Sequence, residues 1–472
     1  MAHLRPVPVA PVSTGMFRLI GDDRYAALSA SVIRAREHLR GRTVWNVGPE
    51  ASIGAVPEML RSLVAYALGA GVDARWLAVQ GQPELARIAR RIYDRLHGLD
   101  GDGGRLGEAE HDEYQHLLAP AVLELISMVR PGDVVILHGP EPAGLMPDVR
   151  TSGAKVAWRG HGGRAPSNPQ ARDAWAFLVR YLDAADAYVF SRASTVPPNL
   201  PRERVEIIPP SVDPLTPKNN EMRRAEAAAV LIGAGIIEGY SAALPAYVLP
   251  SGSMRLILGR AEMLQLEPLE PTSRLVVQIS RWDRLKDPVG VMRGFVEHVP
   301  PDTRSHLVLA GPELTESPDD PEAAAVLRGA TAAWEALPEP ARRRVHIAIL
   351  PASDPGENAA IVNALQRWAQ VVVQKSLAEA VGLTVGEAMW KARPVVASRV
   401  GELEDEVEHE RTGLLLDDPT DLRAFGSAIA RLLDHPDEAH MMGEAGVRRI
   451  WESNLADRHL RQYADLLSRL VE

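Results

Sequence analysis

The sequence predicts an α/β protein built from two doubly wound domains. Short runs of β-branched residues alternate with longer segments of helical periodicity through most of the 472 residues, and such alternation is typical of βαβ units with parallel strands. The strand-like runs are apolar almost throughout, which indicates sheets covered on both faces. The series is too long for one sheet, and it is interrupted at 212–273 by a polar, alanine-rich stretch without a clear strand, so two sheets are expected.

The elements of the first domain follow in chain order. A helix is expected at 57–71, where apolar residues recur at helical spacing before a glycine that signals the end of a helix. The polar run 99–115 contains Asp100 and Asp102, but Gly and Asp are the usual turn residues, so a solvated loop is favoured over a metal site. The expected strands are 42–48, 73–80, 131–139, 155–161, 187–191 and 204–211.

The second domain repeats this pattern after the interruption. The first domain is predicted to cover residues 1–213 and the second 214–451, with a final helix at about 452–472. The expected strands of the second domain are 274–280, 306–312, 344–350, 369–376 and 393–398.

Composition limits the class of function. The chain has no cysteine, so disulfides and thiolate metal sites are excluded, and no metal site is predicted. A formal net charge of −10 argues against a nucleic-acid binder, because such proteins neutralise phosphates with Lys and Arg. About 18 consecutive apolar residues would indicate a membrane span; the sequence has no such run, and its first residues do not resemble a signal peptide. We therefore expect a cytoplasmic protein without a membrane partner.

The segment 371–402 carries the strongest candidate site. Glu379 and Glu387 are separated by seven residues and flank Gly382, where a strand runs into a helix expected to start near Thr384. Ligands of open α/β sheets bind at the carboxyl ends of strands, phosphate suits a helix start, and a glycine lets the backbone approach a ligand. Glu387, expected in the first helical turn, and Glu379 can then accept hydrogen bonds from sugar hydroxyls. Two alternatives remain open: a capping box from Thr384 to Glu387, and a solvated Glu379.

Three further loops after strands carry weaker signals. Arg281 and Lys286 follow the strand 274–280 and can clamp a diphosphate, although two solvated surface cations are the alternative. His161 follows the strand 155–161 and can donate to or accept from a bound sugar, or have a structural role. Gly54 precedes a helix and can admit a ligand to its start, or simply form a tight turn.

Together these segments resemble the retaining glycosyltransferases of the GT-B fold, family 4, and most of all the trehalose synthase group. Glu379 and Glu387 match the family's E-x7-E signature, and Arg281 and Lys286 match its diphosphate-binding pair. The segment 206–219 resembles the stretch that closes the family's first domain.

The resemblance implies a fold and a set of roles. Two Rossmann-like domains would face a central cleft, with the C-terminal helix returning to the N-terminal domain. The donor would be a nucleoside diphosphate sugar, no metal would be needed, and retention would follow from front-face attack. The implied contacts are ribose hydroxyls for Glu387, the transferred sugar for Glu379, diphosphate for Arg281 and Lys286, phosphate and sugar for the backbone of Gly382, Leu383 and Thr384, the donor sugar for His161, and a ligand-binding loop at Gly54.

The sequence also departs from the family pattern. The family usually has E-G-F-G at its first glutamate, where this chain reads E-A-V-G at 379–382, and Gly401 is followed by Glu402 where a second glycine is expected. The first loop, around Gly54, is poorer in glycine than in the trehalose synthase group, and the segment just after His161 also departs from it. Both belong to the N-terminal domain, where the family binds acceptors. The acceptor therefore stays open among glucose, giving trehalose, and an amino sugar, cyclitol or thiol of natural product biosynthesis. A trehalose-phosphorylase type of enzyme, a nucleotide-sugar epimerase and a non-catalytic binding module are alternatives, and a homodimer is expected.

Overall fold

The chain forms two units. The computed structural model describes residues 2–49, 54–81, 83–314, 321–379 and 381–472. Unit 1 comprises Met1–Ser211 with Ala456–Glu472, and unit 2 comprises Val212–Leu455. The boundaries thus fall at 211/212 and 455/456, where the sequence suggested 213/214 and 451/452.

Unit 1 is built on a sheet that has seven strands in the part of the chain described, in the order β1-β3-β2-β4-β5-β6-β7. Every neighbouring pair is parallel except β1 with β3, which is antiparallel. The sequence did not indicate β1, a short edge strand that contains a proline and is not fully buried. The strands are β1 (His3–Val7), β2 (Thr43–Pro49), β3 (Asp73–Gln80), β4 (Val134–His138), β5 (Lys155–Gly160), β6 (Ala187–Phe190) and β7 (Val205–Ile207).

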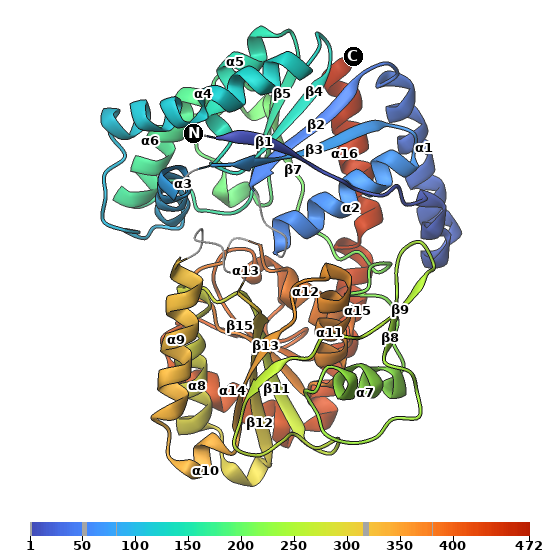
Figure 1. Ribbon diagram of the computed structural model, residues 1–472, viewed down its shortest axis with the longest axis vertical. Coiled ribbons are helices and arrows are strands. Elements are labelled where there is room, and N and C mark those ends of the chain that lie inside the picture. Colours follow the sequence, from blue (N-terminus) through green and yellow to red (C-terminus); the bar gives the residue numbers. More distant parts are fainter. Residues whose placement is uncertain (1, 50–53, 82, 315–320, 380) are drawn as a thin grey trace. The chain divides into compact units, whose positions relative to one another are not determined.

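Helices cover both faces of this sheet (Figure 1). The core on one side joins apolar side chains of the strands to those of α3–α6, while α1, α2 and α16 lie on the other side. The helices are α1 (Asp22–His38), α2 (Ala55–Gly69), α3 (Pro83–Leu96), α4 (Glu108–Met128), α5 (Met146–Thr151), α6 (Pro169–Leu182) and α16 (Ala456–Val471).

The C-terminal helix α16 is fastened to α1. Arg24 of α1 donates two hydrogen bonds to Asp457, at 2.9 and 2.6 Å, and Arg34 donates one to Asp465 at 2.9 Å. The first of these ion pairs is largely buried, where a charge-assisted bidentate contact is among the strong ones. The expected return of this helix to the first domain is therefore found.

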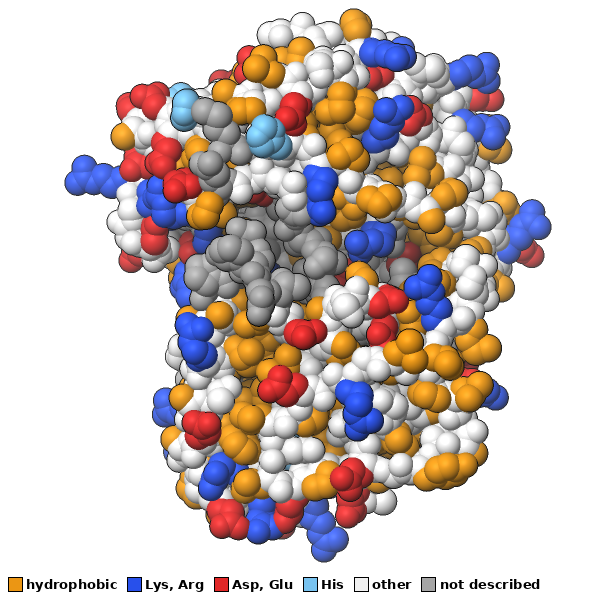
Figure 2. All heavy atoms as spheres, in the orientation of Figure 1, with side chains coloured by type: hydrophobic (Ala, Val, Ile, Leu, Met, Phe, Trp, Pro, Cys, Tyr) orange, Lys and Arg blue, Asp and Glu red, His pale blue; other side chains and the backbone are white. Residues whose placement is uncertain are grey.

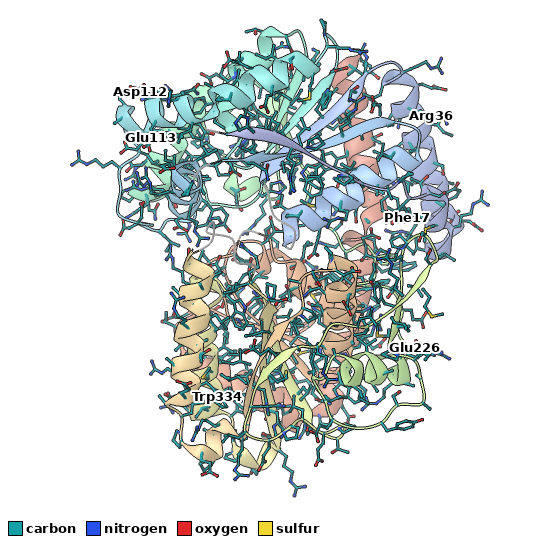
Figure 3. All side chains as sticks on the ribbon, in the orientation of Figure 1. Phe17, Arg36, Asp112, Glu113, Glu226 and Trp334 are labelled. Carbon is teal, nitrogen blue, oxygen red and sulfur yellow. The ribbon has the colours of Figure 1, made fainter. Side chains whose placement is uncertain are left out.

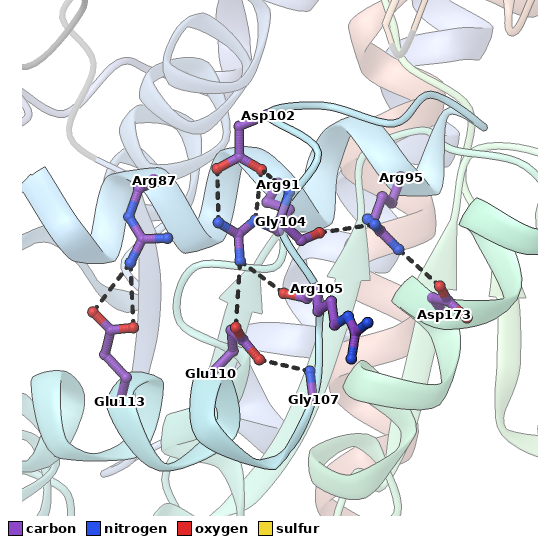
Figure 4. Close-up of polar contacts among 10 residues, drawn as sticks. All are labelled: Arg87, Arg91, Arg95, Asp102, Gly104, Arg105, Gly107, Glu110, Glu113 and Asp173. Carbon is purple, nitrogen blue, oxygen red and sulfur yellow. Dashed lines mark hydrogen bonds and ion pairs between the residues drawn. The ribbon is translucent and has the colours of Figure 1, made fainter.

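The polar run 99–115 is more ordered than the expected solvated loop (Figure 4). Arg91 of α3 is almost fully buried and donates to both carboxylate oxygens of Asp102, at 2.6 and 2.7 Å, and to the carbonyl of Arg105. Arg95 holds the carbonyl of Gly104 at 2.8 Å. Asp102 is thus an anchor for an arginine, and no group of three or more metal-ligating side chains occurs in the described ranges.

Unit 2 repeats the architecture with a sheet in the order β10-β13-β12-β11-β14-β15-β16, again seven strands among the described residues. Only the edge pair β10 and β13 is antiparallel in this sheet as described. The strands are β10 (Glu262–Leu264), β11 (Arg274–Ile279), β12 (Ser305–Pro312), β13 (Val345–Leu350), β14 (Val371–Gln374), β15 (Val395–Ser398) and β16 (Leu414–Leu416).

The expectation that 212–273 holds no strand was wrong. This stretch contains β10 and an antiparallel hairpin of β8 (Ala246–Val248) and β9 (Met254–Leu256). Each of these strands has three residues, too few to produce a recognisable alternation of apolar and polar positions.

The helices of unit 2 also lie on both faces of its sheet. Helices α8, α9 and α14 contribute to the core on one face, while α7, α11 and α12 lie on the other (Figure 1). Trp334 of α9, labelled in Figure 3, donates from its indole to the carbonyl of Val345 at 2.7 Å and so ties this helix to β13. The helices are α7 (Arg224–Gly233), α8 (Pro288–His298), α9 (Pro321–Glu335), α10 (Glu339–Arg342), α11 (Pro355–Trp368), α12 (Leu383–Trp390), α13 (Leu403–Glu406), α14 (Leu422–Asp434) and α15 (Pro436–Ser453).

The surface carries mixed charge. Figure 2 shows acidic and basic side chains interspersed over the visible face of each unit. No helix within the described ranges is long and apolar enough to cross a bilayer.

A pair of histidines, the buried His346 and the half-buried His306, joins neighbouring strands of unit 2. Gln265 Oε1 lies 3.2 Å from His346 Nδ1, which must donate because a carbonyl oxygen only accepts. His346 Nε2 is then the acceptor for the Nδ1–H of His306, at 3.0 Å. His346 is therefore neutral, and burial lowers its pKa to about 3, with the neighbouring His306 adding to the effect. Burial also lowers the pKa of His306.

Acidification is expected to destabilise unit 2 through this pair. His346 has a folded pKa near 3 and an unfolded value near 6.5, so its contribution is present above pH 6.5 and is lost as the pH falls toward 3. The slope approaches about 1.4 kcal/mol per pH unit in that window. Urea unfolding at pH 7.5, 6.0 and 5.0 should therefore show a steeper pH dependence in the wild type than in His346→Gln. Equal slopes in the two proteins would contradict the assignment.

Candidate functional site

The site in unit 2 follows from the pairing of two strands. β11 and β14 are adjacent and parallel, so the loops that follow them leave from the same edge of the sheet. Lys286 lies in the loop after β11, and Glu379 lies in the loop after β14. The structure brings the two side chains into a buried ion pair.

Lys286 sits in a turn that is fixed on both sides. Asp283 accepts a hydrogen bond from the Leu285 amide at 2.8 Å, and Gln278 at the end of β11 donates to the carbonyl of Lys286 at 2.9 Å. The next residue, Asp287, has a left-handed backbone with φ of 48° and caps α8 through the amide of Gly290.

A second lysine stabilises the turn that carries Lys286. Lys375, at the end of β14, is fully buried and forms an ion pair with Asp287. It also donates to the carbonyl of Pro419 at 2.7 Å. Since a buried charge needs such partners, Lys375 ties the turn that carries Lys286 to the neighbouring strand.

Glu379 is surrounded by hydrogen-bond donors. It is 7% exposed, and its Oε2 accepts from Ser376 Oγ at 2.9 Å, from Gln374 Nε2 at 3.3 Å and from Lys286. The alternative of a solvated loop residue is therefore excluded. The arrangement fixes a carboxylate and an ammonium group next to the start of α12.

Glu387 lies farther from the start of its helix than the sequence predicted, and its side chain is buried. The helix α12 begins at Leu383 and has Gly382 as its N-cap, with no side-chain cap and no acidic residue in the first turn. Both the capping box from Thr384 and the expected first-turn position of Glu387 were therefore wrong. Glu387 is 2% exposed and faces Lys218, whose Nζ lies 3.2 Å from Glu387 Oε1.

Close packing explains why a glycine stands at the start of α12. Gly382 has φ of −85°, which any residue adopts, but a β-carbon there would lie 2.5 Å from Leu403 and 3.1 Å from Glu406. Leu383 is buried, whereas Thr384 is half-buried and its carbonyl accepts from Gln366 at 3.2 Å. The glycine thus lets the helix start lie against the segment that follows β15.

That segment contributes an acid which the sequence analysis missed. Glu406 is buried, and its pKa is raised well above the usual range by burial and then by the neighbouring Glu402, Glu379 and Glu387. Only one departure from the family pattern lies nearby, Glu402 in place of the expected glycine, and it does not by itself indicate that Glu406 is buried.

Arg281 remains at the rim of the site. Its side chain is 48% exposed, and its guanidinium lies 3.4 Å from Asp283. The structure therefore brings Lys286 to Glu379 but leaves Arg281 in the solvent-exposed part of the same loop.

Unit 1 holds the two other predicted residues. His161 follows β5, and its Nε2 lies 3.1 Å from Nδ1 of His138, at the end of the adjacent strand β4. His138 Nε2 donates in turn to Asn46 Oδ1 at 3.2 Å, so the proton between the two rings belongs to His161 Nε2. Burial and then the cation of Arg159 lower the pKa of both rings, that of His138 to about 3. His161 is thus neutral, and its Nε2–H is directed at His138.

Gly54 is the N-cap of α2 and has φ of 144°, a conformation that strongly favours glycine. The helix start lacks a side-chain cap. The preceding residues Ser52 and Ile53 lie outside the described ranges, so the loop that Gly54 closes is described only from that glycine onward.

Each of the two units matches a model of a known protein family. A family model for the trehalose synthase N-terminal domain matches residues 47–197, and a model for glycosyl transferases group 1 matches residues 344–449. The trehalose synthase of Thermococcus litoralis is 29% identical over 95% of each chain, and that of Rubrobacter xylanophilus is 29% identical over 92% of each. The trehalose phosphorylase of Pleurotus sajor-caju is more distant, at 22% identity over 86% of this chain and 56% of its own length.

Solved structures support the fold. An alpha,alpha-trehalose-phosphate synthase (UDP-forming) from Burkholderia vietnamiensis superposes with a TM-score of 0.65 at 16% identity, covering 90% of this chain and 96% of its own. A sucrose-phosphate synthase from Thermosynechococcus elongatus superposes with a TM-score of 0.61 at 16% identity, covering 91% and 99%. With two parallel-sheet units and matches along most of its length, the chain is a trehalose synthase-like glycosyltransferase of the GT-B fold.

Proposed function

We propose that this glycosyltransferase moves a sugar from a nucleoside diphosphate sugar to a small polar acceptor, with retention at the anomeric carbon and without a metal ion. Glucose, giving trehalose, is the first acceptor to test, because relatives named trehalose synthase align with 95% of the chain. The buried ion pair of Lys286 and Glu379 is the observation that carries the proposal.

The ion pair is suited to bind a nucleoside diphosphate sugar, because this substrate offers one partner to Lys286 and another to Glu379. Two buried charges need compensation, and Lys286 and Glu379 supply it to each other. A bound donor brings a diphosphate, which attracts the ammonium group, and sugar hydroxyls, which donate to the carboxylate. Lys286 would then stabilise the charge that develops on the leaving diphosphate, and Glu379 would orient the transferred sugar.

The start of α12 adds a second phosphate-binding element. Its N-cap, Gly382, provides no side-chain hydrogen bond to the first turn. The backbone amides of Leu383 and Thr384 are therefore suited to donate hydrogen bonds to phosphate oxygens. Arg281, on the exposed side of the Lys286 loop, would close on the same diphosphate. Together, Lys286, Arg281 and the start of α12 would form a leaving-group clamp that needs no metal ion.

Removing the Glu379 charge is expected to reduce turnover by about 100-fold or more, the usual effect of losing one transition-state contact. Glu379→Gln keeps the shape and the hydrogen-bond acceptor, and its activity should be compared with the wild type under saturating donor and acceptor. Glu297→Gln is the matched control, since Glu297 is an exposed partner of Arg293 on α8 and should leave turnover unchanged. Wild-type turnover in Glu379→Gln, or in Arg281→Ala, would contradict the assigned roles.

Chelation is expected to leave turnover within about twofold, because cationic side chains and the α12 dipole supply the leaving-group stabilisation. The measurement compares initial rates before and after dialysis against EDTA. A large loss that is restored by Mg²⁺ or Mn²⁺ would contradict the metal-independent proposal.

The donor and acceptor are identified by one series of incubations followed by NMR. We expect UDP-, GDP-, ADP- or dTDP-glucose, mixed with glucose, to give a new α-linked product together with the free nucleoside diphosphate. Exchange driven by inorganic phosphate would instead favour a phosphorylase. Conversion of the nucleotide sugar without an acceptor would favour an epimerase, and tight donor binding without transfer to any acceptor would favour a binding module.

A further inference from the structure

The segment from Pro217 to Asn220 in unit 2 is held rigidly against α11 and α12, although it contains no helix or strand. Four side chains of these helices bind it, and together they contact three of its four residues. They are Asn363 to the carbonyl of Pro217 at 3.0 Å, Lys391 to Asn219 Oδ1 at 2.9 Å, Trp390 to the carbonyl of Asn219 at 3.0 Å, and Arg367 to the carbonyl of Asn220 at 2.9 Å.

The remaining residue of the segment is Lys218, and its side chain is directed at Glu387. The ammonium nitrogen lies 3.2 Å from Glu387 Oε1, and the two side chains are 17% and 3% exposed. The carboxylate stands among other acidic groups, since its charge is one cause of the raised pKa of Glu406. The Lys218 ammonium group therefore compensates a buried carboxylate that lies near another acid.

We propose that Lys218 is a positioning residue that orients Glu387 for the hydroxyls of the donor's ribose and so sets a preference for ribonucleotides over 2′-deoxyribonucleotides. The inference rests on the proposed function, in which Glu387 binds that ribose. A carboxylate accepts two neighbouring hydroxyls only when its plane is fixed. An ammonium group has donors and no acceptor, so it fixes one oxygen of Glu387 without competing for the hydroxyl protons.

The anchoring of the segment 217–220 explains how a long, flexible lysine side chain can hold Glu387 in one orientation. A lysine on a mobile loop would lose much side-chain entropy when a ligand binds. Here the backbone on both sides of Lys218 is held by α11 and α12, so the order is present before the ligand arrives, which favours affinity. Lys391 donates to the carbonyl of Glu387 as well as to Asn219, and it therefore couples the segment to the glutamate's own turn.

Calorimetry with three pairs of nucleotides tests the inference: UDP with dUDP, GDP with dGDP, and ADP with dADP. For the pair that binds the wild type, Lys218→Met should weaken binding of the ribonucleotide about tenfold, the scale of one charge-assisted contact. It should weaken binding of the 2′-deoxy form less than about twofold, so the preference for ribose falls. Lys218→Arg keeps the charge and should restore most of the preference. Lys155→Met is the matched control, because Lys155 is an exposed partner of Asp186 in unit 1.

A double-mutant cycle shows whether Lys218 acts through Glu387. Because the two groups are in contact, their effects should not add, and Lys218→Met combined with Glu387→Gln should bind the ribonucleotide no more weakly than Glu387→Gln alone. Thermal unfolding checks that each variant is folded, and Lys218→Gln replaces Lys218→Met if the latter is not.

The outcomes separate the inference from the function on which it rests. Equal weakening of the ribose and deoxyribose forms by Lys218→Met, additive effects in the cycle, or no change at all would overturn the positioning role alone. A wild-type protein that binds dTDP but none of the three ribonucleotides would overturn this inference and leave the proposed function standing. A wild-type protein that binds neither dTDP nor any of the three ribonucleotides would overturn both.

Discussion

The ion pair between Lys286 and Glu379 is the interaction on which the rest of the donor site depends. It exists because β11 and β14 are neighbours in a parallel sheet, so that residues 93 positions apart in the chain leave the same edge together. It is supported on one side by the ion pair of Lys375 with Asp287, and on the other by hydrogen bonds from Ser376 and Gln374 to Glu379. A network of this kind specifies one geometry, because any displaced member leaves a buried group unsatisfied.

Much of this arrangement was predictable from the sequence, for a physical reason. Strands buried on both faces are apolar throughout, so β2–β6 and β11–β15 were recognisable, and a parallel sheet delivers its loops to one edge. The short strands β8–β10 and the edge strand β1 gave no such signal. The position of Glu387 was also mistaken, because a Thr-x-x-Glu pattern indicates a capping box whether or not the helix begins there, and here it begins at Leu383.

The residues that sequence reasoning missed act across large separations in the chain. Lys218 approaches Glu387 from a segment without regular structure, and no local pattern indicates such a contact. Glu406 owes its raised pKa to burial beside three other carboxyl groups, a property of the packed molecule. In unit 1 the proton positions of His161 and His138 depend on Asn46 in a third strand. Each of these depends on which strands and loops are neighbours in space, which the order of residues does not reveal directly.

The return of α16 to unit 1 has a consequence for how the polypeptide is made. The ribosome releases residues 1–211 first, yet the helix that covers one face of their sheet, and that binds Arg24 and Arg34, lies at 456–471. Unit 2 is continuous in the chain and can assemble as soon as it emerges. Unit 1 is therefore synthesised first but completed last. A chain that ended at residue 455 would contain all of unit 2 and a unit 1 with an uncovered apolar surface, the kind of species that chaperones bind.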